Sequence, residues 1–112
     1  MRNELIKLIV PEKLRNSDGF LTEKLLHVTE VFAEEKGIRR AEFYAAAREG
    51  ITLTKMMAVD RYDFESAIIE IDGKKQKPSE VEHDGITYRI IRTYIPENSM
   101  QMELYLQEEE NG

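Results

Sequence analysis

The sequence contains no cysteine, and this absence limits both the fold and the chemistry. Disulfide bonds, thiolate zinc sites and cysteine nucleophiles are all excluded. The fold must therefore be held by packing alone, which suits a reducing compartment. With 112 residues the chain has the size of one ordinary domain, so we expect a single domain over residues 1–112.

Long apolar runs are also missing. No window approaches the roughly 18 consecutive apolar residues of a membrane helix. The start of the chain, MRNELIKLIVPEK, is too short and too charged for a signal peptide. We expect a soluble protein that has no membrane contact and is not secreted.

Positive charge is in the minority, with 16 Lys and Arg against 22 Asp and Glu and a net charge of −6. Affinity for nucleic-acid phosphates comes mainly from clustered Lys and Arg, so general nucleic-acid binding is not expected. The one basic cluster is in DGKKQKPSE, residues 72–80, where we expect an exposed turn or loop carrying Lys74, Lys75 and Lys77.

Motifs for chemistry are absent too. The sequence has no GxxxxGK[ST], GxGxxG or GxSxG pattern. Its two histidines, His27 and His83, do not form a metal-binding spacing, and we expect structural or surface roles for both. A group of carboxylates lacks the Gly and Glu positions of a calcium loop: Asp60, Asp63, Glu65 and Asp72. We expect no enzyme, no catalytic residue, no cofactor and no metal.

Runs of β-branched and apolar residues, separated by turn residues, dominate what is present. They predict strands at residues 4–10, 20–35, 51–59, about 64–71, 81–83, 86–95 and 100–106. Turns are expected at 15–20 and at Asp84-Gly85, and Pro11 should end the first strand. Residues 20–35 would also fit one face of a helix, but a strand returning from the turn is the preferred interpretation.

One segment differs from the rest. IRRAEFYAAAREG is rich in Ala, Glu and Arg and ends at Gly50, which predicts a short helix at about residues 39–49. So short a helix is marginal in water and must pack on something. Either Phe43 and Ala47 close one end of a barrel, or the segment meets a neighbouring subunit. Both can hold, and the candidate interface residues are Arg39, Arg40, Phe43, Tyr44 and Arg48.

These elements predict a mainly β fold. About six short strands and one helix, with long loops, should close into a small antiparallel β-barrel or roll, because closure removes unpaired sheet edges. The acidic end of the chain, residues 108–112, is expected to be flexible.

Two stretches together resemble a known family. TEVFAEEKGIRRAEFYAAAREGITLTKMMAV is similar to a strand, an "-EFY-A-" box and the next strand in the head-to-tail joining proteins of tailed bacteriophages. HDGITYRIIRTYIPENSMQMELYL resembles the terminal signature of that family, with an acidic-Gly turn, Ile-Ile-Arg and a last strand containing Glu-Leu. With the N-terminal hairpin, the resemblance covers most of the chain.

The resemblance implies a structural role in the phage neck. Such head-closure or stopper proteins have a small β-barrel with a helix and long mobile loops, and they form a ring, here expected to be dodecameric, on the portal and adaptor proteins. They close the channel of the DNA-filled capsid and provide the docking surface for the tail, including its tail-completion protein. The genome passes through the ring without specific binding.

The resemblance also implies a location and an assembly state. The protein would be made in the cytoplasm of the bacterial host, from a phage or prophage gene, and would end in the virion. We expect the isolated chain to be a monomer that assembles on a preformed template. Two alternatives remain: a tail-completion protein of the same neck, and a small nucleic-acid-binding barrel that stacks bases on its exposed aromatic residues.

Overall fold

The computed structural model describes residues 4–109, and this part of the chain is mainly β, as predicted. Strands make up 58% of it and there are two helices, one of them very short. The elements follow in the order β1 (Glu4–Arg15), β2 (Leu21–Lys36), α1 (Arg40–Ala47), β3 (Lys55–Asp60), α2 (Arg61–Ser66), β4 (Ile69–Ile71), β5 (Lys74–Gln76), β6 (Glu80–His83), β7 (Ile86–Tyr94) and β8 (Gln101–Glu108).

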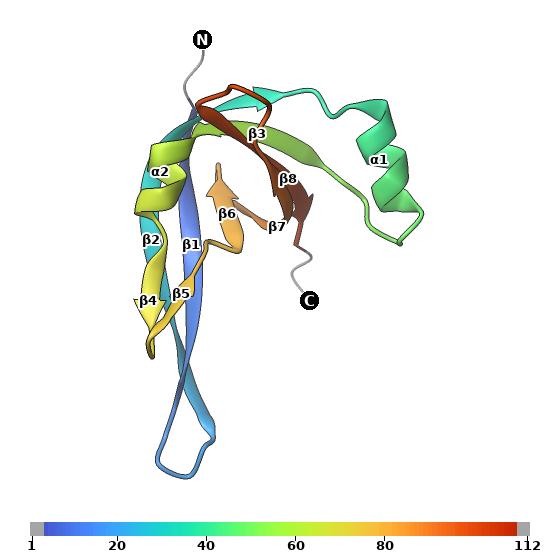
Figure 1. Ribbon diagram of the computed structural model, residues 1–112. Coiled ribbons are helices and arrows are strands. Elements are labelled where there is room, and N and C mark those ends of the chain that lie inside the picture. Colours follow the sequence, from blue (N-terminus) through green and yellow to red (C-terminus); the bar gives the residue numbers. More distant parts are fainter. Residues whose placement is uncertain (1–3, 110–112) are drawn as a thin grey trace.

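Six strands close into a small barrel with the neighbour order β1-β2-β3-β8-β7-β6, which confirms the predicted fold class (Figure 1). All neighbouring pairs are antiparallel. The closing contact between β1 and β6 is short, pairing Lys7–Ile9 with Glu80–Glu82. The strands are not spread evenly round an axis, so the barrel is irregular.

The interior of the barrel is filled by side chains that alternate along the strands. Ile6 and Leu8 from β1, Met57 and Val59 from β3, and Leu104 and Leu106 from β8 belong to one buried apolar cluster. The alternation is the period-2 pattern of a strand with one face in the core. The sequence of β8 shows this alternation in Met102, Leu104 and Leu106. The residues between them, Glu103 and Tyr105, are buried as well, on the other face of the strand.

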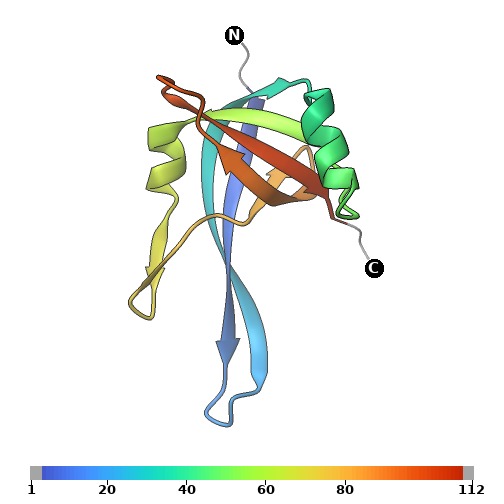
Figure 2. The same ribbon diagram turned by 45° about the vertical axis from the view of Figure 1, so that its right-hand side comes forward.

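The β1–β2 hairpin extends well past the barrel as a two-stranded arm, which we define as residues 11–26 (Figures 1 and 2). The molecule is correspondingly elongated, with extents of 47 × 31 × 25 Å. The arm ends in the predicted turn, where the backbone N–H groups of Asp18 and Phe20 donate to the Asn16 side chain at 3.0 Å. Gly19 supplies the positive φ of 84° that this turn needs.

The prediction that Pro11 ends the first strand is wrong, because β1 continues to Arg15. The carbonyl of Ile9 accepts a hydrogen bond from the Ser79 N–H at 3.0 Å, so Ile9 points its backbone groups away from β2. Pro11 lies two residues later and points its nitrogen to the same side, where the ladder with β6 has already ended. The missing N–H therefore costs no ladder bond.

The strand predicted around residues 64–71 is also wrong in its first half, which forms α2. Asp60 caps this helix, since its side chain accepts the Tyr62 N–H at 2.8 Å. Phe64 and Ala67, three residues apart, turn into the barrel core. The helical period that places both inward was hidden by the surrounding β-branched residues.

Three boundaries differ from the sequence prediction. Strand β3 begins at Lys55 rather than residue 51, because Ile51 and Leu53 pack beneath α1. The expected loop at residues 72–80 begins as a β4–β5 hairpin, turned by Asp72 and Gly73 at φ 52° and 78°. The expected flexible end is ordered at Glu108, which is in β8, while residues 110–112 lie outside the described part of the chain.

Phe64 is the side chain through which α2 closes the barrel, so we predict that Phe64→Ala lowers the free energy of unfolding by about 3–5 kcal/mol. Urea unfolding followed by circular dichroism measures this. The matched control is Tyr62→Ala on the exposed side of the same helix, which should change stability by no more than about 0.5 kcal/mol. Equal effects of both substitutions would contradict the placement of α2.

Candidate functional site: the α1 segment

The connection between β2 and β3, residues 37–54, lies against the outer face of the barrel and carries α1 (Figure 2). A second apolar cluster forms there, with Leu53, Met56 and Tyr105 buried at its centre. Strands β3 and β8 are therefore buried on both faces, and for β3 this explains the continuous apolar run from Met56 to Val59. Partly buried side chains complete this cluster: Ile38, Ala46, Ile51 and Ile91.

A buried carboxylate anchors the start of this segment to β8. Glu103 is 4% exposed, and Arg39 donates to both of its oxygens, at 3.3 and 3.2 Å. Arg39 also donates to the Tyr105 hydroxyl at 3.0 Å, and that hydroxyl donates to Glu103 Oε1 at 2.8 Å. The two-point contact of a guanidinium with a carboxylate is a strong, oriented interaction, so it fixes where the segment leaves β2.

The network shifts two pKa values. Burial, followed by the hydrogen bond to Glu103, raises the pKa of Tyr105 to about 12. The nearby Tyr105, and then Glu103, raise the pKa of the Arg39 guanidinium. Arg39 therefore remains a cation, and Tyr105 remains a neutral donor throughout the physiological range.

A second arginine holds the helix itself. Arg92 of β7 forms an ion pair with Glu42 in the first turn of α1. Its guanidinium lies over the Tyr105 ring, 4.9 Å from the ring centroid, and 5.6 Å from that of Tyr94. The hydrogen bond with Glu42 is the main cause of its raised pKa. The cation–π contacts join this pair to the Arg39 network.

The outer side of α1 presents aromatic and basic side chains to solvent. Phe43 is 38% and Tyr44 is 55% exposed, and their rings pack edge to face with centroids 5.8 Å apart. Arg40, at the start of this helix, and Arg48, directly after its last residue, are exposed as well. The structure thus places four of the five predicted interface residues outward, and it places the fifth, Arg39, in the anchoring network.

The expectation that Phe43 and Ala47 close one end of the barrel is wrong. Both are exposed, and Ala46 is the α1 side chain that packs on the second cluster. The barrel receives Phe64 of α2 instead. A signal was present in the sequence, because Glu42 and Ala46 lie four residues apart and share one face of α1.

The lysines of the predicted exposed loop form no common site with α1. Lys74 and Lys75 are in β5 and Lys77 follows it, and all three are exposed, as predicted. The β4–β5 hairpin lies on the other side of the barrel from α1 in both views (Figures 1 and 2).

Each histidine has a carboxylate partner. His27 lies 2.8 Å from Glu12 across the arm. His83, 4% exposed, has Nε2 at 2.9 Å from Glu4 and Nδ1 at 3.2 Å from the Lys55 Nζ. Because the Lys55 ammonium donates, Nδ1 accepts and Nε2–H donates to Glu4. This chain of contacts links β3, β6 and β1 next to the short closing ladder of the barrel.

The same histidine belongs to a group that sequence spacing did not reveal. Glu4, His83 and Asp84 place one ligand atom each within 4.8 Å of one another, a set that could hold a metal ion. The Lys55 ammonium on the other ring nitrogen opposes a second positive charge there. The arrangement is already satisfied as an ion-pair network.

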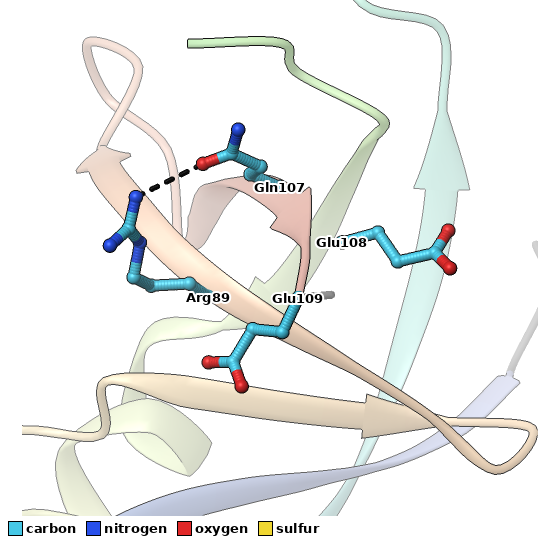
Figure 3. Close-up of a pocket in the computed structure, with 4 residues that line it drawn as sticks. All are labelled: Arg89, Gln107, Glu108 and Glu109. Carbon is cyan, nitrogen blue, oxygen red and sulfur yellow. Dashed lines mark hydrogen bonds between the residues drawn. The ribbon is translucent and has the colours of Figure 1, made fainter. Parts of the chain in front are cut away.

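A polar hollow of about 350 Å³ lies at the end of β7 and β8 (Figure 3). Arg89 points toward Gln107 and donates to its side-chain oxygen at 3.0 Å, while Glu108 points away from them. Burial, and then the nearby charge of Glu109, raise the pKa of Glu80 beside this hollow. The surplus of carboxylates makes it unsuited to phosphate groups.

Comparison with known proteins leaves the chain without an assigned family: no protein-family model matches it, and no curated protein does either. Over residues 4–109, no helix is both long enough and apolar enough to cross a membrane. The resemblance to phage joining proteins therefore remains a sequence-based expectation.

We predict that Tyr105→Phe lowers the free energy of unfolding by about 1–2 kcal/mol at neutral pH. The substitution removes the hydroxyl that donates to buried Glu103 and accepts from Arg39, and it leaves the packing of the ring intact. Urea unfolding at pH 7 measures the loss. Tyr44→Phe, on an exposed ring, is the matched control and should have no measurable effect.

Ionisation of Tyr105 makes the free energy of unfolding depend on pH at alkaline pH. The unfolded phenol loses its proton near pH 10, whereas folded Tyr105 keeps it until about pH 12. This contribution to stability is therefore complete below pH 10 and is lost as the pH rises to 12. The stability difference between wild type and Tyr105→Phe should shrink across that window, and a difference that grows would contradict the network.

Proposed function

We propose that this protein is a non-enzymatic structural component of a tailed-phage neck, which closes the DNA channel of the filled capsid and joins head to tail. In this proposal the chain forms a ring on the portal and adaptor proteins and presents a docking surface for the tail. Its final location is the virion, after synthesis in the bacterial cytoplasm.

The observation that carries the proposal is the outward orientation of the aromatic residues in EFYAAA. This is the stretch that resembles the family box, and its Phe43 and Tyr44 face solvent instead of the core. Exposed aromatic and arginine side chains are typical of the energetic centres of protein interfaces. The helix is held from behind by Arg39 and Arg92, so this surface is presented on a fixed base.

The strand edges also suit a subunit of a ring. Among the described residues, β2 pairs with β3 only over Ala33–Lys36, so the preceding part of β2 has one edge without a strand neighbour. The arm exposes apolar side chains on both faces: Phe20, Leu21, Leu25 and Leu26. Exposed edges and apolar surface of this kind support association with further protein.

The charge distribution fits a channel through which DNA slides. The net charge is −6, and the hollow beside Glu108 and Glu109 is acidic. The three clustered lysines, on the far side from α1, offer few phosphate contacts. Binding of random duplex DNA by the isolated monomer at physiological salt would instead favour a nucleic-acid-binding barrel.

The direct test is deletion of the gene from an inducible phage that carries it, with complementation from a plasmid. Loss of closure predicts packaged heads that leak DNA and carry no tails, as seen by electron microscopy and by nuclease sensitivity of the packaged genome. Stable full heads beside free tails would assign the chain to tail completion. Normal infectious particles would refute both neck roles.

A double substitution tests the outer surface of α1. We predict that Tyr44→Ala with Arg48→Ala leaves the melting temperature unchanged within about 2 °C, because surface changes alter stability by about 0.5 kcal/mol or less. In the complementation assay the same variant should reduce infectious titre at least about tenfold. Lys74→Ala with Lys75→Ala, equally exposed but distant from α1, is the control and should complement fully.

Loss of the cooperative thermal transition in the Tyr44 and Arg48 variant would show that these side chains support the fold. Full complementation by a stable variant would remove this surface from the proposed interface.

A further inference from the structure

A small cavity lies between α1 and the outer face of the barrel. Its volume is about 140 Å³. Apolar side chains form much of its lining, and two carboxylates of α1 and its C-terminal end contribute as well: Ala46, Ile51, Leu53, Ile91, Glu42 and Glu49. A cavity of about this size in another protein accepts one benzene molecule, so the space suits a single phenyl ring.

The chain itself offers a phenyl group that the fold leaves uncovered. Phe20 is 69% exposed, which is the largest exposed fraction among the large apolar side chains with described exposure, and Phe32 is 60% exposed. Phe32 lies within β2, opposite Leu5 of β1, and therefore away from any turn. Phe20 lies at the turn of the arm, which extends well past the barrel (Figure 1). A ring at this position can enter the cavity of a second molecule while the barrels of the two molecules stay apart.

The arm cannot deliver Phe20 to the cavity of its own chain. The tip of the arm and α1 lie far apart in both views, because the arm extends downward from the barrel and α1 lies at its side (Figures 1 and 2). A strand hairpin anchored in the barrel does not fold back over that span while β1 and β2 remain paired. The occupant must therefore come from another molecule, and a second copy of this chain carries the same exposed phenyl group.

Each surface carries one charge that the other can pair with. Arg15 lies at the arm turn, where its guanidinium donates to the Gly19 carbonyl at 3.1 Å and remains exposed. Glu42 and Glu49 line the cavity, and Glu42 is already neutralised by Arg92. An incoming arm would place Arg15 close to the second carboxylate, Glu49.

We propose that Phe20 of one copy inserts into the cavity beneath α1 of the next copy, with Arg15 facing Glu49. The two surfaces differ, so the contact is head-to-tail and generates a ring where the rotation closes. The inference rests on the proposed ring and names the contact that would build it. It also gives the arm a function that the neck role alone does not require.

Cysteine cross-linking tests this in the intact chain, because the protein contains no cysteine of its own. Asp18→Cys marks the arm beside Phe20, and Ala45→Cys marks the cavity rim on a differently tagged copy that keeps Glu49. Equimolar mixtures at millimolar concentration are oxidised, and the disulfide-linked heterodimer is quantified by denaturing electrophoresis. We expect a heterodimer whose yield falls about tenfold when Phe20→Ala is added to the Asp18→Cys chain, since one buried phenyl group supplies much of so small a contact.

Phe32→Ala in the same Asp18→Cys chain is the matched control and should leave the yield unchanged. No heterodimer, or a yield insensitive to Phe20→Ala, would overturn the proposed contact. Such a failure is separable from failure of the neck function, because leaking tailless heads after gene deletion would still stand. Normal particles after gene deletion, together with a Phe20-dependent heterodimer, would refute the neck function and leave the proposed contact standing.

Discussion

The contact of Arg39 with buried Glu103 is the interaction on which the outer half of the structure depends. A carboxylate on the covered face of β8 is costly unless it is paired, and the guanidinium, together with the Tyr105 hydroxyl, satisfies both of its oxygens. This requirement determines where the chain leaves β2 and therefore where α1 lies. Because Ala46 faces the barrel, Phe43 and Tyr44 face outward, and the cavity beneath the helix is left open.

The sequence was most informative where local chemistry decides the structure. Asp84-Gly85 has the two positive φ angles of a tight hairpin turn, and the apolar alternation of β8 identifies the side chains in the barrel. It failed where tertiary position decides. Pro11 is tolerated because no strand lies on its open side, and α2 forms because Asp60 caps a turn that delivers Phe64 to the core. Neither fact depends on neighbouring residues alone.

The sequence predicted which residues form the candidate site, but it did not predict which way their side chains point. The helix and its arginines were expected, yet Arg39 is an anchor, and Ala46 packs on the barrel in place of the expected Phe43 and Ala47. The partner of Arg39 lies 64 residues away in β8, so no local pattern could identify it. Glu103 and Tyr105 are polar side chains within an otherwise apolar strand. They were the one available sign in the sequence that a charged side chain must cover the outer face of β8.

The two surfaces that we propose as contacts, the arm and α1, lie on different parts of the closed barrel (Figure 1). The central claim is that the chain occupies a ring in a phage neck. A cryo-electron microscopy reconstruction of the neck of particles from a phage encoding this chain tests it most directly. The account predicts a closed ring of this barrel beneath the portal, with the α1 surface against an adjacent subunit. A neck resolved well enough to trace, from which this fold is absent, would contradict it.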